Sequence, residues 1–563
     1  MRKQFIALFF IILVASFLRF YQLGTIPAGL TNDEANTGYD AFSLLLTGRD
    51  QWNNFLPITN FIGFGDYPPP LYRYLSIVPI SLFGLNMFSV RFISALSGVL
   101  SVVVLYFLIK KIFNQKAAIF SALSLAILPW SIGLSRVAIE SNLAILFLIT
   151  ALYFGIALKS DKSIFFSVIF LVLSIFTYSA YTLFAPLVFL LILFFNYKKV
   201  KTKILLFSII LFLCLCLPLF VHKGAASTRF SQIGITQNIN SIGLMNVLND
   251  QRGQCLNSFN PLMCKLSENK PVLFTGVFFK NYLSHFSLNF LYAKGTVTQF
   301  SILEERGLDY LFCIIFLTLG LYFLIAKNKN TKISLVVILL FLFSAIPDSL
   351  TGDGNYSRAS MMQPFIAILN GLGLAFLFAL LNKIKNKNLK ILGMFFIAFL
   401  IMFSISSFFV NYLTYFKNNY AMYSQYGYKN LMEYVGKVKN DYERIYISKH
   451  LNDTKQYIYY LFFNKYDPRK FQTKTNIGYH LEDNGWVSVD RIDNVYFVQN
   501  LPLISKKLTN LNNNILYISN PVDFPKGVKT EFITKDKLEN VIFKAVKKEN
   551  LIEYYQEFDY LNE

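Results

Sequence analysis

The sequence predicts an all-α polytopic membrane protein with about eleven transmembrane helices, followed by a small exported α/β domain. Of the 563 residues, 54% are hydrophobic and only 15% are charged, whereas an ordinary soluble domain has about 25% charged residues. Apolar runs of about 17–25 residues recur along the chain, and this length crosses a hydrocarbon core of ~30 Å. After residue 414 the pattern changes to short β-rich runs between polar stretches.

The first predicted span is an N-terminal apolar run that has the charged start of a signal peptide. Because the run is long and has no clear small-residue cleavage site, we interpret it as an uncleaved helix. The segment 71–84 is apolar but short, so we expect an interfacial helix that leads into the second span. The predicted spans cover residues 4–20, 86–109, 117–134, 140–158, 163–179, 181–196, 203–221, 309–326, 333–347, 359–381 and 391–414.

The net charge of +21 comes largely from lysines in short loops between the apolar runs. Lysines in alternate loops orient helices and meet anionic headgroups, so we reject a nucleic-acid partner. The positive-inside rule predicts a plasma (inner) membrane protein with a cytoplasmic N-terminus. The loops 21–85 and 222–308 and the C-terminal domain then lie outside the cytoplasm.

The C-terminal domain, residues 415–563, is expected to be a small α/β domain. Its predicted strands are 444–450, 495–500, 515–520 and 541–546, with helices near 428–440 and 455–464. Short runs rich in β-branched and aromatic residues between polar stretches are typical of strands.

Two cysteines, Cys255 and Cys264, share the second exported loop. They can form a disulfide if the loop lies in an oxidising compartment, or stay free. The other three cysteines lie in apolar runs and are expected to be packing residues. No CxxC pair is present, so the sequence does not suggest a zinc site.

Adjacent carboxylates, Asp33 and Glu34, follow the first span by a few residues. Like charges this close disfavour double ionisation, so one of the two titrates nearer to neutral pH. Such a carboxylate can act as a general base or hold a divalent cation. The structural alternative is that Asn32 or Asp33 caps a helix of residues 34–46.

Ionisable residues are almost absent from the middle of the predicted spans and gather near their outer ends. These residues are Arg19, Arg91, Arg136, Glu140, Asp348 and Arg358. An ion-coupled transporter generally needs ionisable groups or broken helices near the midplane. The distribution therefore favours a reaction centre at the outer membrane surface.

Several motifs follow one another in a fixed order over about residues 1–380. They are Asp33-Glu34, Thr47–Asp50, the YPPPLY segment of Tyr67–Tyr72, Phe83-Gly84, Ser89–Arg91, Pro129-Trp130, Ser135–Glu140, 285–295, 304–307 and 346–364. In combination they resemble the bacterial GT-C glycosyltransferases that use polyprenyl-phosphate sugars. That group comprises glycosyltransferase family 39 and the RgtA/B/C/D-like enzymes. Its relatives are the dolichyl-phosphate-mannose protein mannosyltransferases and the lipid A aminoarabinose transferases.

The resemblance implies a GT-C core over residues 1–414 and an enzyme that moves a hexosyl or pentosyl unit with inversion. The donor would be a polyprenyl-phosphate monosaccharide within the membrane lipids. The acceptor would be a hydroxyl group of a glycolipid, an envelope polysaccharide or a protein at the outer face.

The resemblance also implies roles for single residues. Asp33 matches the catalytic aspartate, with Glu34 beside it, and Glu140 matches a second acidic position where some relatives carry aspartate. Some relatives use a divalent cation, here Mg or Mn near Asp33 and Glu140. The candidates for binding the donor phosphate are Arg91, Arg136 and Arg358, because a guanidinium can donate two hydrogen bonds to phosphate at once.

Each of these residues has a structural alternative. Arginines at helix ends can anchor spans in headgroups, and Glu140 can favour the start of a helix through the dipole. His285 is a candidate for donor or acceptor contact, and its alternative is a structural hydrogen bond. Tyr67 and Tyr72 are candidates for stacking on a sugar, whereas the prolines between them fix an extended turn.

Three alternative functions stay open. The chain could be a non-catalytic membrane anchor of an envelope protein, or a transporter or flippase for a lipid-linked substrate. The third alternative is an oligosaccharide transferase, which moves a preassembled glycan from a diphosphate carrier.

Overall fold

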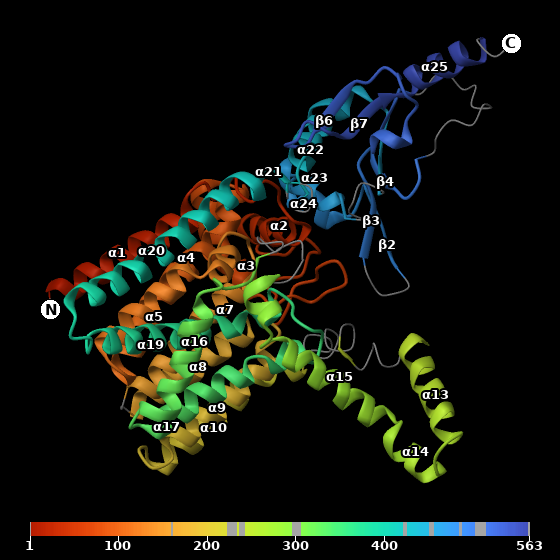
Figure 1. The fold of residues 1–563 in the computed structure, drawn as a ribbon. Coiled ribbons are helices and arrows are strands. Elements are labelled where there is room, and N and C mark those ends of the chain that lie inside the picture. Colours follow the sequence, from red (N-terminus) through yellow and green to blue (C-terminus); the bar gives the residue numbers. More distant parts are fainter. Residues whose placement is uncertain are drawn as a thin grey trace. The chain divides into compact units, whose positions relative to one another are not determined.

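The computed structural model describes residues 2–158, 161–221, 234–235, 242–294, 306–419, 421, 425–449, 455–482, 487–501 and 514–560. The chain divides into two compact units (Figure 1). We call them the helical unit (residues 1–21, 67–71 and 94–409) and the sheet unit (residues 22–66, 72–93 and 410–563).

The helical unit contains the long apolar helices. The helices that lie wholly or mostly in it are α1 (Arg2–Phe20), α4 (Met87–Ile112), α5 (Gln115–Ile127), α6 (Pro129–Ser135), α7 (Glu140–Leu152), η1 (Tyr153–Ala157), α8 (Asp161–Ile175), α9 (Tyr181–Asn196), α10 (Thr202–Val221), α13 (Ile242–Leu256), α14 (Pro261–Ser267), α15 (Lys270–Ser284), η2 (Asn289–Ala293), α16 (Cys313–Tyr322), η3 (Phe323–Lys327), α17 (Thr331–Phe343), α18 (Ile346–Ser349), η4 (Arg358–Met362), α19 (Gln363–Leu381) and α20 (Lys387–Asn411).

The apolar helices support a multi-pass membrane protein, and each predicted span overlaps one or two helical elements. Among the described residues, six helices are long and apolar enough to cross a membrane, or seven if the bent pair α5–α6 is one span. Four further apolar helices are shorter: Phe5–Phe20, Leu71–Phe83, Tyr181–Asn196 and Cys313–Lys327. The pair α5–α6 bends by 57°, because Pro129 lacks the amide hydrogen that would continue α5.

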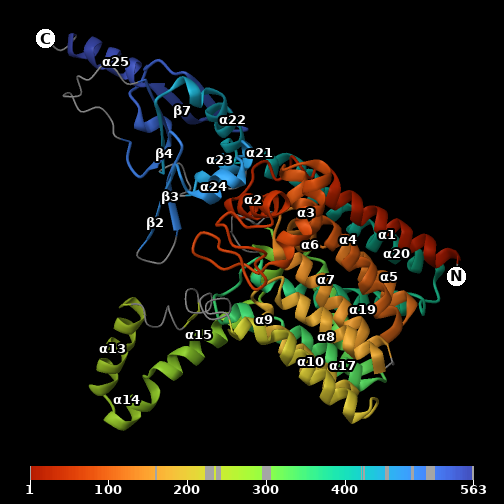
Figure 2. The ribbon, with the colours of Figure 1, turned by 180° about the vertical axis from the view of Figure 1, so that it is seen from behind.

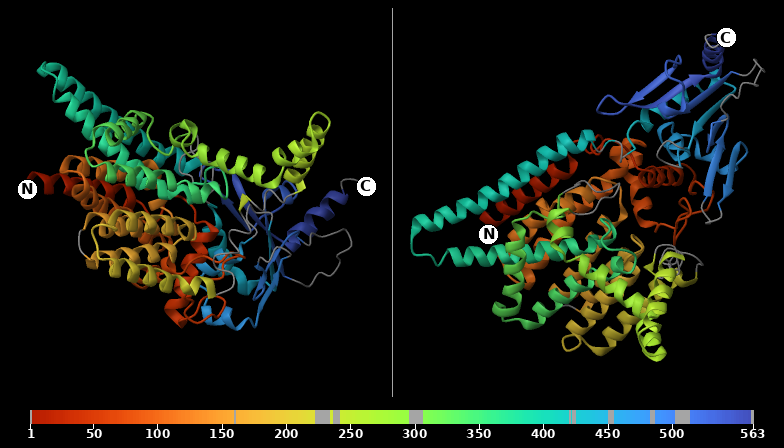
Figure 3. Two further views of the ribbon diagram at one scale, coloured as in Figure 1. Left: turned by 90° about the horizontal axis from the view of Figure 1, so that it is seen from below. Right: turned by 45° about the vertical axis from the view of Figure 1, so that its right-hand side comes forward.

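Glycines let helices of this unit approach closely. A Cβ atom on Gly320 would lie 2.1 Å from the carbonyl oxygen of Leu369, and one on Gly373 would lie 1.8 Å from that of Phe316. Small residues at such crossings allow backbone contact between membrane helices. At the other side of the bundle α1 and α20 run side by side, with Phe17 against Phe409 (Figure 3).

The sheet unit contains one seven-stranded mixed sheet in the order β2-β3-β4-β1-β5-β7-β6, seen from behind in Figure 2. Only β1 is paired in parallel on both sides, with β4 and β5. The elements that lie wholly or mostly in this unit are α2 (Asn32–Thr47), α3 (Leu71–Phe83), η5 (Tyr412–Phe416), α21 (Lys417–Asn419), α22 (Tyr428–Val438), η6 (Lys439–Asp441), β1 (Arg444–Ser448), α23 (Tyr457–Phe463), α24 (Pro468–Thr473), β2 (Ile477–Leu481), β3 (Val487–Ile492), β4 (Val495–Val498), β5 (Ile515–Ser519), η7 (Pro521–Asp523), β6 (Phe532–Lys535), β7 (Val541–Lys547) and α25 (Lys548–Tyr560).

Part of the first loop packs with the C-terminal region inside the sheet unit. The Tyr39 hydroxyl of α2 donates to the carbonyl oxygen of Tyr466 at 2.9 Å. Gly38 has no room for a Cβ atom, because Phe462 and Val90 side chains would lie 2.6 Å away. Residues 22–66 of the first loop and residues 410–563 therefore belong to one packed unit, in which α2 contacts α23 and α24.

Candidate functional site

Asp33 lies exposed in the first turn of α2, and the helix start is fixed by a capping box. The Thr31 hydroxyl accepts from the amide of Glu34 at 3.2 Å, and the Glu34 carboxylate accepts from the amide of Thr31 at 3.1 Å. The cap is thus Thr31, one position before Asn32 and two before Asp33, the two residues expected from the sequence. A carboxylate in the first turn also lies in the favourable field of the helix dipole.

Glu34 forms a fully buried ion pair with Arg91. Arg91 Nε donates to Glu34 Oε1 at 2.8 Å and Nη2 donates to Oε2 at 3.1 Å. The remaining donors of Arg91 reach backbone carbonyls of the loop before α2, those of Leu23, Pro27 and Gly29. Arg91 thereby fixes both the loop and the carboxylate next to Asp33, and in this structure its guanidinium is fully engaged.

A second buried acid–base pair lies two helical turns further along α2, and the sequence analysis did not identify it. Arg73 Nε donates to Asp40 Oδ2 at 3.1 Å, and both side chains are buried. Burial raises the pKa of Asp40 to about 7. The charge of Arg73 lowers this pKa, and the charge of Asp50 raises it further. The only signals in the sequence are the heptad spacing from Asp33 and the position of Arg73 directly after YPPPLY.

This pKa predicts that Asp40→Asn changes how stability depends on pH. The folded pKa lies above that of the unfolded chain, so the folded state holds a proton that the unfolded state has already lost. Wild-type stability should therefore fall as the pH rises from about 4 to 7, by at most about 1.4 kcal/mol per pH unit from this group. Asp40→Asn should remove this slope. Thermal unfolding in detergent at several pH values measures it.

The control for that series is Asp441→Asn, which removes an exposed carboxylate of the same unit. Its profile should run parallel to that of the wild type. A profile of Asp40→Asn that also runs parallel would mean that Asp40 is already ionised throughout this range.

The helical unit brings together His285, Asp348 and Arg358. Arg358 Nε donates to Asp348 Oδ1 at 2.9 Å, and His285 Nε2 lies 2.9 Å from Asp348 Oδ2. His285 Nδ1 lies 2.7 Å from the carbonyl oxygen of Asn281. Both ring nitrogens thus lie within hydrogen-bond distance of oxygen atoms.

Arg358 is the member of this cluster that reaches the surface. Its side chain is 25% exposed, whereas those of His285 and Asp348 are 0% exposed. Since Asp348 engages only Nε, the guanidinium is oriented with its terminal nitrogens available for a further acceptor. In the sequence Asp348 lies near the end of a span, but no pattern links it with His285, which lies 63 residues earlier.

Arg136 closes the end of α1. Its buried guanidinium donates to the carbonyl oxygens of Leu18 at 3.0 Å, Arg19 at 3.2 Å and Tyr21 at 2.7 Å. These are carbonyls that the helix end leaves without intrahelical partners. Glu140 begins α7 and is half-buried.

The two tyrosines of YPPPLY differ in exposure. Tyr72 is buried, and its hydroxyl donates to the carbonyl oxygen of Val90 at 2.9 Å. Tyr67 is half-buried and belongs to the helical unit. Of the two, Tyr67 therefore has the more accessible ring.

The possible cation position near Asp33 and Glu140 involves acidic residues of both units. Within the described ranges, no group of three or more His, Cys, Asp or Glu side chains is placed to hold a metal ion. Asp33 belongs to the sheet unit and Glu140 to the helical unit.

The chain is similar to one known protein family and to several solved membrane-protein structures. Residues 67–222 match the family described as dolichyl-phosphate-mannose-protein mannosyltransferase. No curated protein sequence matches the chain. The crystal structure of ArnT from Cupriavidus metallidurans bound to undecaprenyl phosphate has a TM-score of 0.50 at 12% identity, covering 95% of this chain and 97% of that chain.

The archaeal oligosaccharyltransferase AglB from Archaeoglobus fulgidus also matches. Its complex with an inhibitory peptide and a dolichol-phosphate has a TM-score of 0.50 at 13% identity, covering 82% of this chain and 63% of that chain. The resemblance to the mannosyltransferase-like GT-C glycosyltransferases is thereby confirmed, and this chain is a membrane protein with the GT-C fold.

Proposed function

We propose that the protein is an inverting glycosyltransferase that moves a monosaccharide from a polyprenyl phosphate to a hydroxyl acceptor at the outer face of the membrane. The observation that carries the proposal is the exposed Asp33 carboxylate, held on a capped helix beside a buried ion pair in a chain with the GT-C fold. A single preorganised carboxylate suits a reaction that needs one base.

The step requires one proton acceptor and no proton donor. The acceptor hydroxyl oxygen attacks the anomeric carbon of the sugar from the side opposite the phosphate. Its proton passes to the Asp33 carboxylate, the new C–O bond forms, and the bond between the anomeric carbon and the phosphate oxygen breaks. The polyprenyl phosphate leaves with the electron pair. One displacement inverts the anomeric centre, and the leaving phosphate needs positive charge rather than a carboxylic acid.

Arg358 is our first candidate for that charge, because its guanidinium is oriented by Asp348 and partly exposed. Arg136 and Arg91 are further candidates for binding the donor phosphate. The main role of Arg91 is to hold Glu34 in position. Glu140 is the second acidic candidate. For sugar contacts we assign the accessible Tyr67 before the buried Tyr72 and His285.

The proposed topology has eleven spans in the plasma membrane. The helices at all eleven predicted positions support it, with the shorter ones crossing in a thinner or locally adapted bilayer. On the positive-inside rule, the lysine-rich loops support a cytoplasmic N-terminus and an extracytoplasmic domain of residues 415–563.

The test is a transfer assay with the purified protein in lipid nanodiscs. It is supplied with radiolabelled polyprenyl-phosphate sugars and a membrane extract as the acceptor pool. Label that moves covalently to an acceptor supports the transferase. Movement of the donor between leaflets without covalent transfer would instead identify a flippase. Transfer from polyprenyl-diphosphate glycans alone would identify an oligosaccharide transferase, and no activity with any donor would favour the membrane anchor.

Arg358→Ala is expected to weaken donor binding. Loss of charge-assisted hydrogen bonds to a phosphate should raise KM for the lipid donor about 10- to 100-fold. Arg358→Lys should recover part of this loss, since a lysine keeps the charge but not the planar fork. The matched control is Lys385→Ala, which removes an exposed cation from a short loop of the helical unit. An unchanged KM in Arg358→Ala would remove Arg358 from the donor site.

A further inference from the structure

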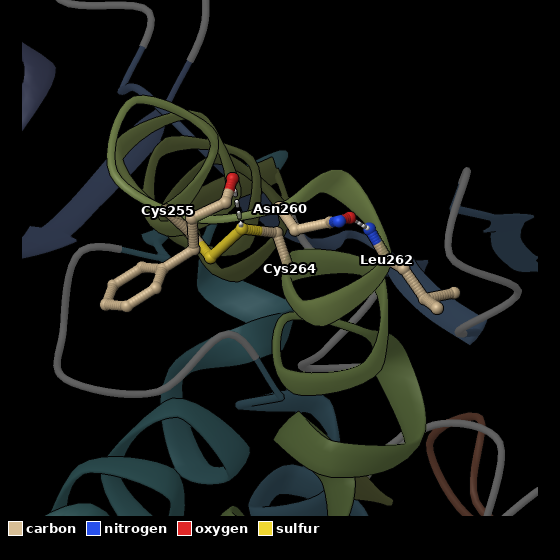
Figure 4. Close-up of a disulfide and its surroundings, with 5 residues drawn as sticks. Cys255, Asn260, Leu262 and Cys264 are labelled. Atoms are coloured by element: carbon tan, nitrogen blue, oxygen red, sulfur yellow. Dashed lines mark hydrogen bonds between the residues drawn. A yellow bond between two sulfur atoms is a disulfide. The ribbon is translucent and has the colours of Figure 1, made fainter.

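Helices α13, α14 and α15 form a cross-linked arm, residues 242–284, in the helical unit. Cys255 at the end of α13 and Cys264 in α14 form a disulfide (Figure 4). Asn260 caps α14 by accepting from the amide of Leu262 at 2.9 Å, and Asn269 caps α15 by accepting from the amide of Val272 at 2.9 Å. The turns of the arm are therefore fixed by covalent and hydrogen bonds of their own.

The tip of the arm, residues 255–266, is apolar although it is exposed. Its five large apolar side chains have 48% to 65% of their surface exposed: Leu256, Phe259, Leu262, Met263 and Leu266. The disulfide occupies the interior between the helices, with Cys264 fully buried. A clustered apolar surface of this kind marks contact with a partner or a membrane rather than with water.

The stalk of the arm, α15, continues the apolar surface. Val272, Phe279 and Leu283 are all exposed, and their spacing of seven and four residues puts them on one side of a helix. Gly276, four residues after Val272, lies on the same side and has open space around it.

The base of the stalk joins the helical unit at the end of a candidate span. Asn281 donates from its side-chain amide to the carbonyl oxygen of Ser349 at 3.2 Å, and Ser349 is the last residue of the span Thr331–Ser349. In Figures 1 and 2, α15 leads away from the bundle with α13 and α14 at its far end. The arm thus leaves the helical unit beside the end of a candidate span.

The charges near the tip suit a phosphate-rich surface. Lys265 and Lys270 are exposed beside the apolar side chains, as is Arg252 on α13, whereas the nearby acidic residues are Asp250 and Glu268. Lysine stems can lie along an apolar surface while their ammonium groups reach anionic headgroups.

We propose that the arm is an interfacial membrane-binding element that seats its apolar tip and stalk in the headgroup–acyl boundary of the bilayer. The occupant of this surface is lipid, because the surface begins at the end of a membrane span and is flanked by lysines. A helix of this kind lies about 5–10 Å into the interface. A disulfide is stable in an oxidising compartment, which agrees with the exported side proposed for this loop.

Tryptophan fluorescence of the full-length protein in nanodiscs of phosphatidylcholine and phosphatidylglycerol tests the proposal. Leu262→Trp places the probe in the apolar tip, and Gln251→Trp places the matched control on an exposed polar position of α13. The lipids carry bromine near the start of the acyl chain, and the signal of the three native tryptophans is subtracted using the wild type. We expect quenching at position 262 to exceed that at position 251 by at least about twofold.

A second probe, Phe259→Trp, covers the case in which Leu262→Trp does not fold. Replacing both cysteines by serine should reduce the quenching at position 262, because the tip is then no longer held open. Weak and equal quenching at positions 262 and 251 would overturn the proposal. Quenching that stays weak while the tip cross-links to a second copy, or is protected by added envelope extract, would assign the surface to that partner instead.

Discussion

Asp33→Asn is expected to abolish sugar transfer while leaving the fold and donor binding intact. The carboxylate is exposed in the first turn of α2, outside the packed core, so its replacement should disturb the fold little. Removal of a general base lowers kcat by about 10²- to 10⁴-fold. Loss of the charge at the helix start should cost only about 0.3–1 kcal/mol of stability. Transfer rates with saturating polyprenyl-phosphate sugar, together with thermal unfolding, measure both effects.

A matched control for Asp33→Asn is Glu549→Gln. Glu549 is also an exposed acid in the first turn of a helix of the sheet unit, α25. It should show the same small effect of the helix dipole and unchanged transfer. Transfer by Asp33→Asn at the wild-type rate would move the chemistry to another residue. A parallel loss of donor binding would show instead that Asp33 acts on the ground state.

The positions of the spans could be predicted from the sequence because hydropathy alone decides which segments lipid tolerates. Their number could not be fixed so simply. Helices such as Tyr181–Asn196 are shorter than a full crossing, and the turn at Pro129 bends one predicted span by 57°. The number of spans therefore depends on whether short helices and the bent pair are counted as crossings. Neighbouring helices can support a short or bent segment in the membrane.

Some strands of the sheet unit could be predicted from the sequence and others could not. The predicted strands coincide with β1, β4, β5 and β7, and all four are flanked on both sides by other strands. The sequence analysis missed β2, β3 and β6. Strand β2 exposes most of its residues, and β6 is four residues long at the sheet edge. Edge strands bury little, so their sequences show no strong alternation.

The local part of the candidate site was visible in the sequence, whereas its partners were not. Thr31 and Glu34 are three residues apart, which is the spacing of a capping box. This spacing could have been recognised in the sequence. The partner of Glu34 lies 57 residues later and that of Asp40 lies 33 residues later. Pairings over such distances depend on how the loop folds back, and no periodicity encodes them.

Arg91→Ala is expected to destabilise the protein more than any other substitution considered for the site. It leaves Glu34 as a buried carboxylate without its cation and removes the donors to three backbone carbonyls. Breaking one side of a buried ion pair costs about 3–5 kcal/mol. Arg91→Lys should recover only part of this, because one ammonium cannot reach both carboxylate oxygens and the loop carbonyls in the same geometry.

The double variant Glu34→Gln/Arg91→Met separates the ion pair from the rest of the loop. Because it removes both charges, it should be less destabilised than the sum of Glu34→Gln and Arg91→Met alone, with a coupling of about 1–3 kcal/mol. Glu539→Gln, which removes one member of the exposed pair Lys535–Glu539, is the control and should change stability by less than about 0.5 kcal/mol. Denaturation midpoints in detergent provide the comparison.

The same variants test whether Glu34 and Arg91 position Asp33. If the pair holds the start of α2 in place, Arg91→Lys should lower kcat more than it raises KM for the donor, because the base is misplaced while the phosphate site is kept. A rise in KM with unchanged kcat would instead put Arg91 itself on the donor phosphate. The buried position of its guanidinium and its five bonds to Glu34 and the loop favour the positioning role.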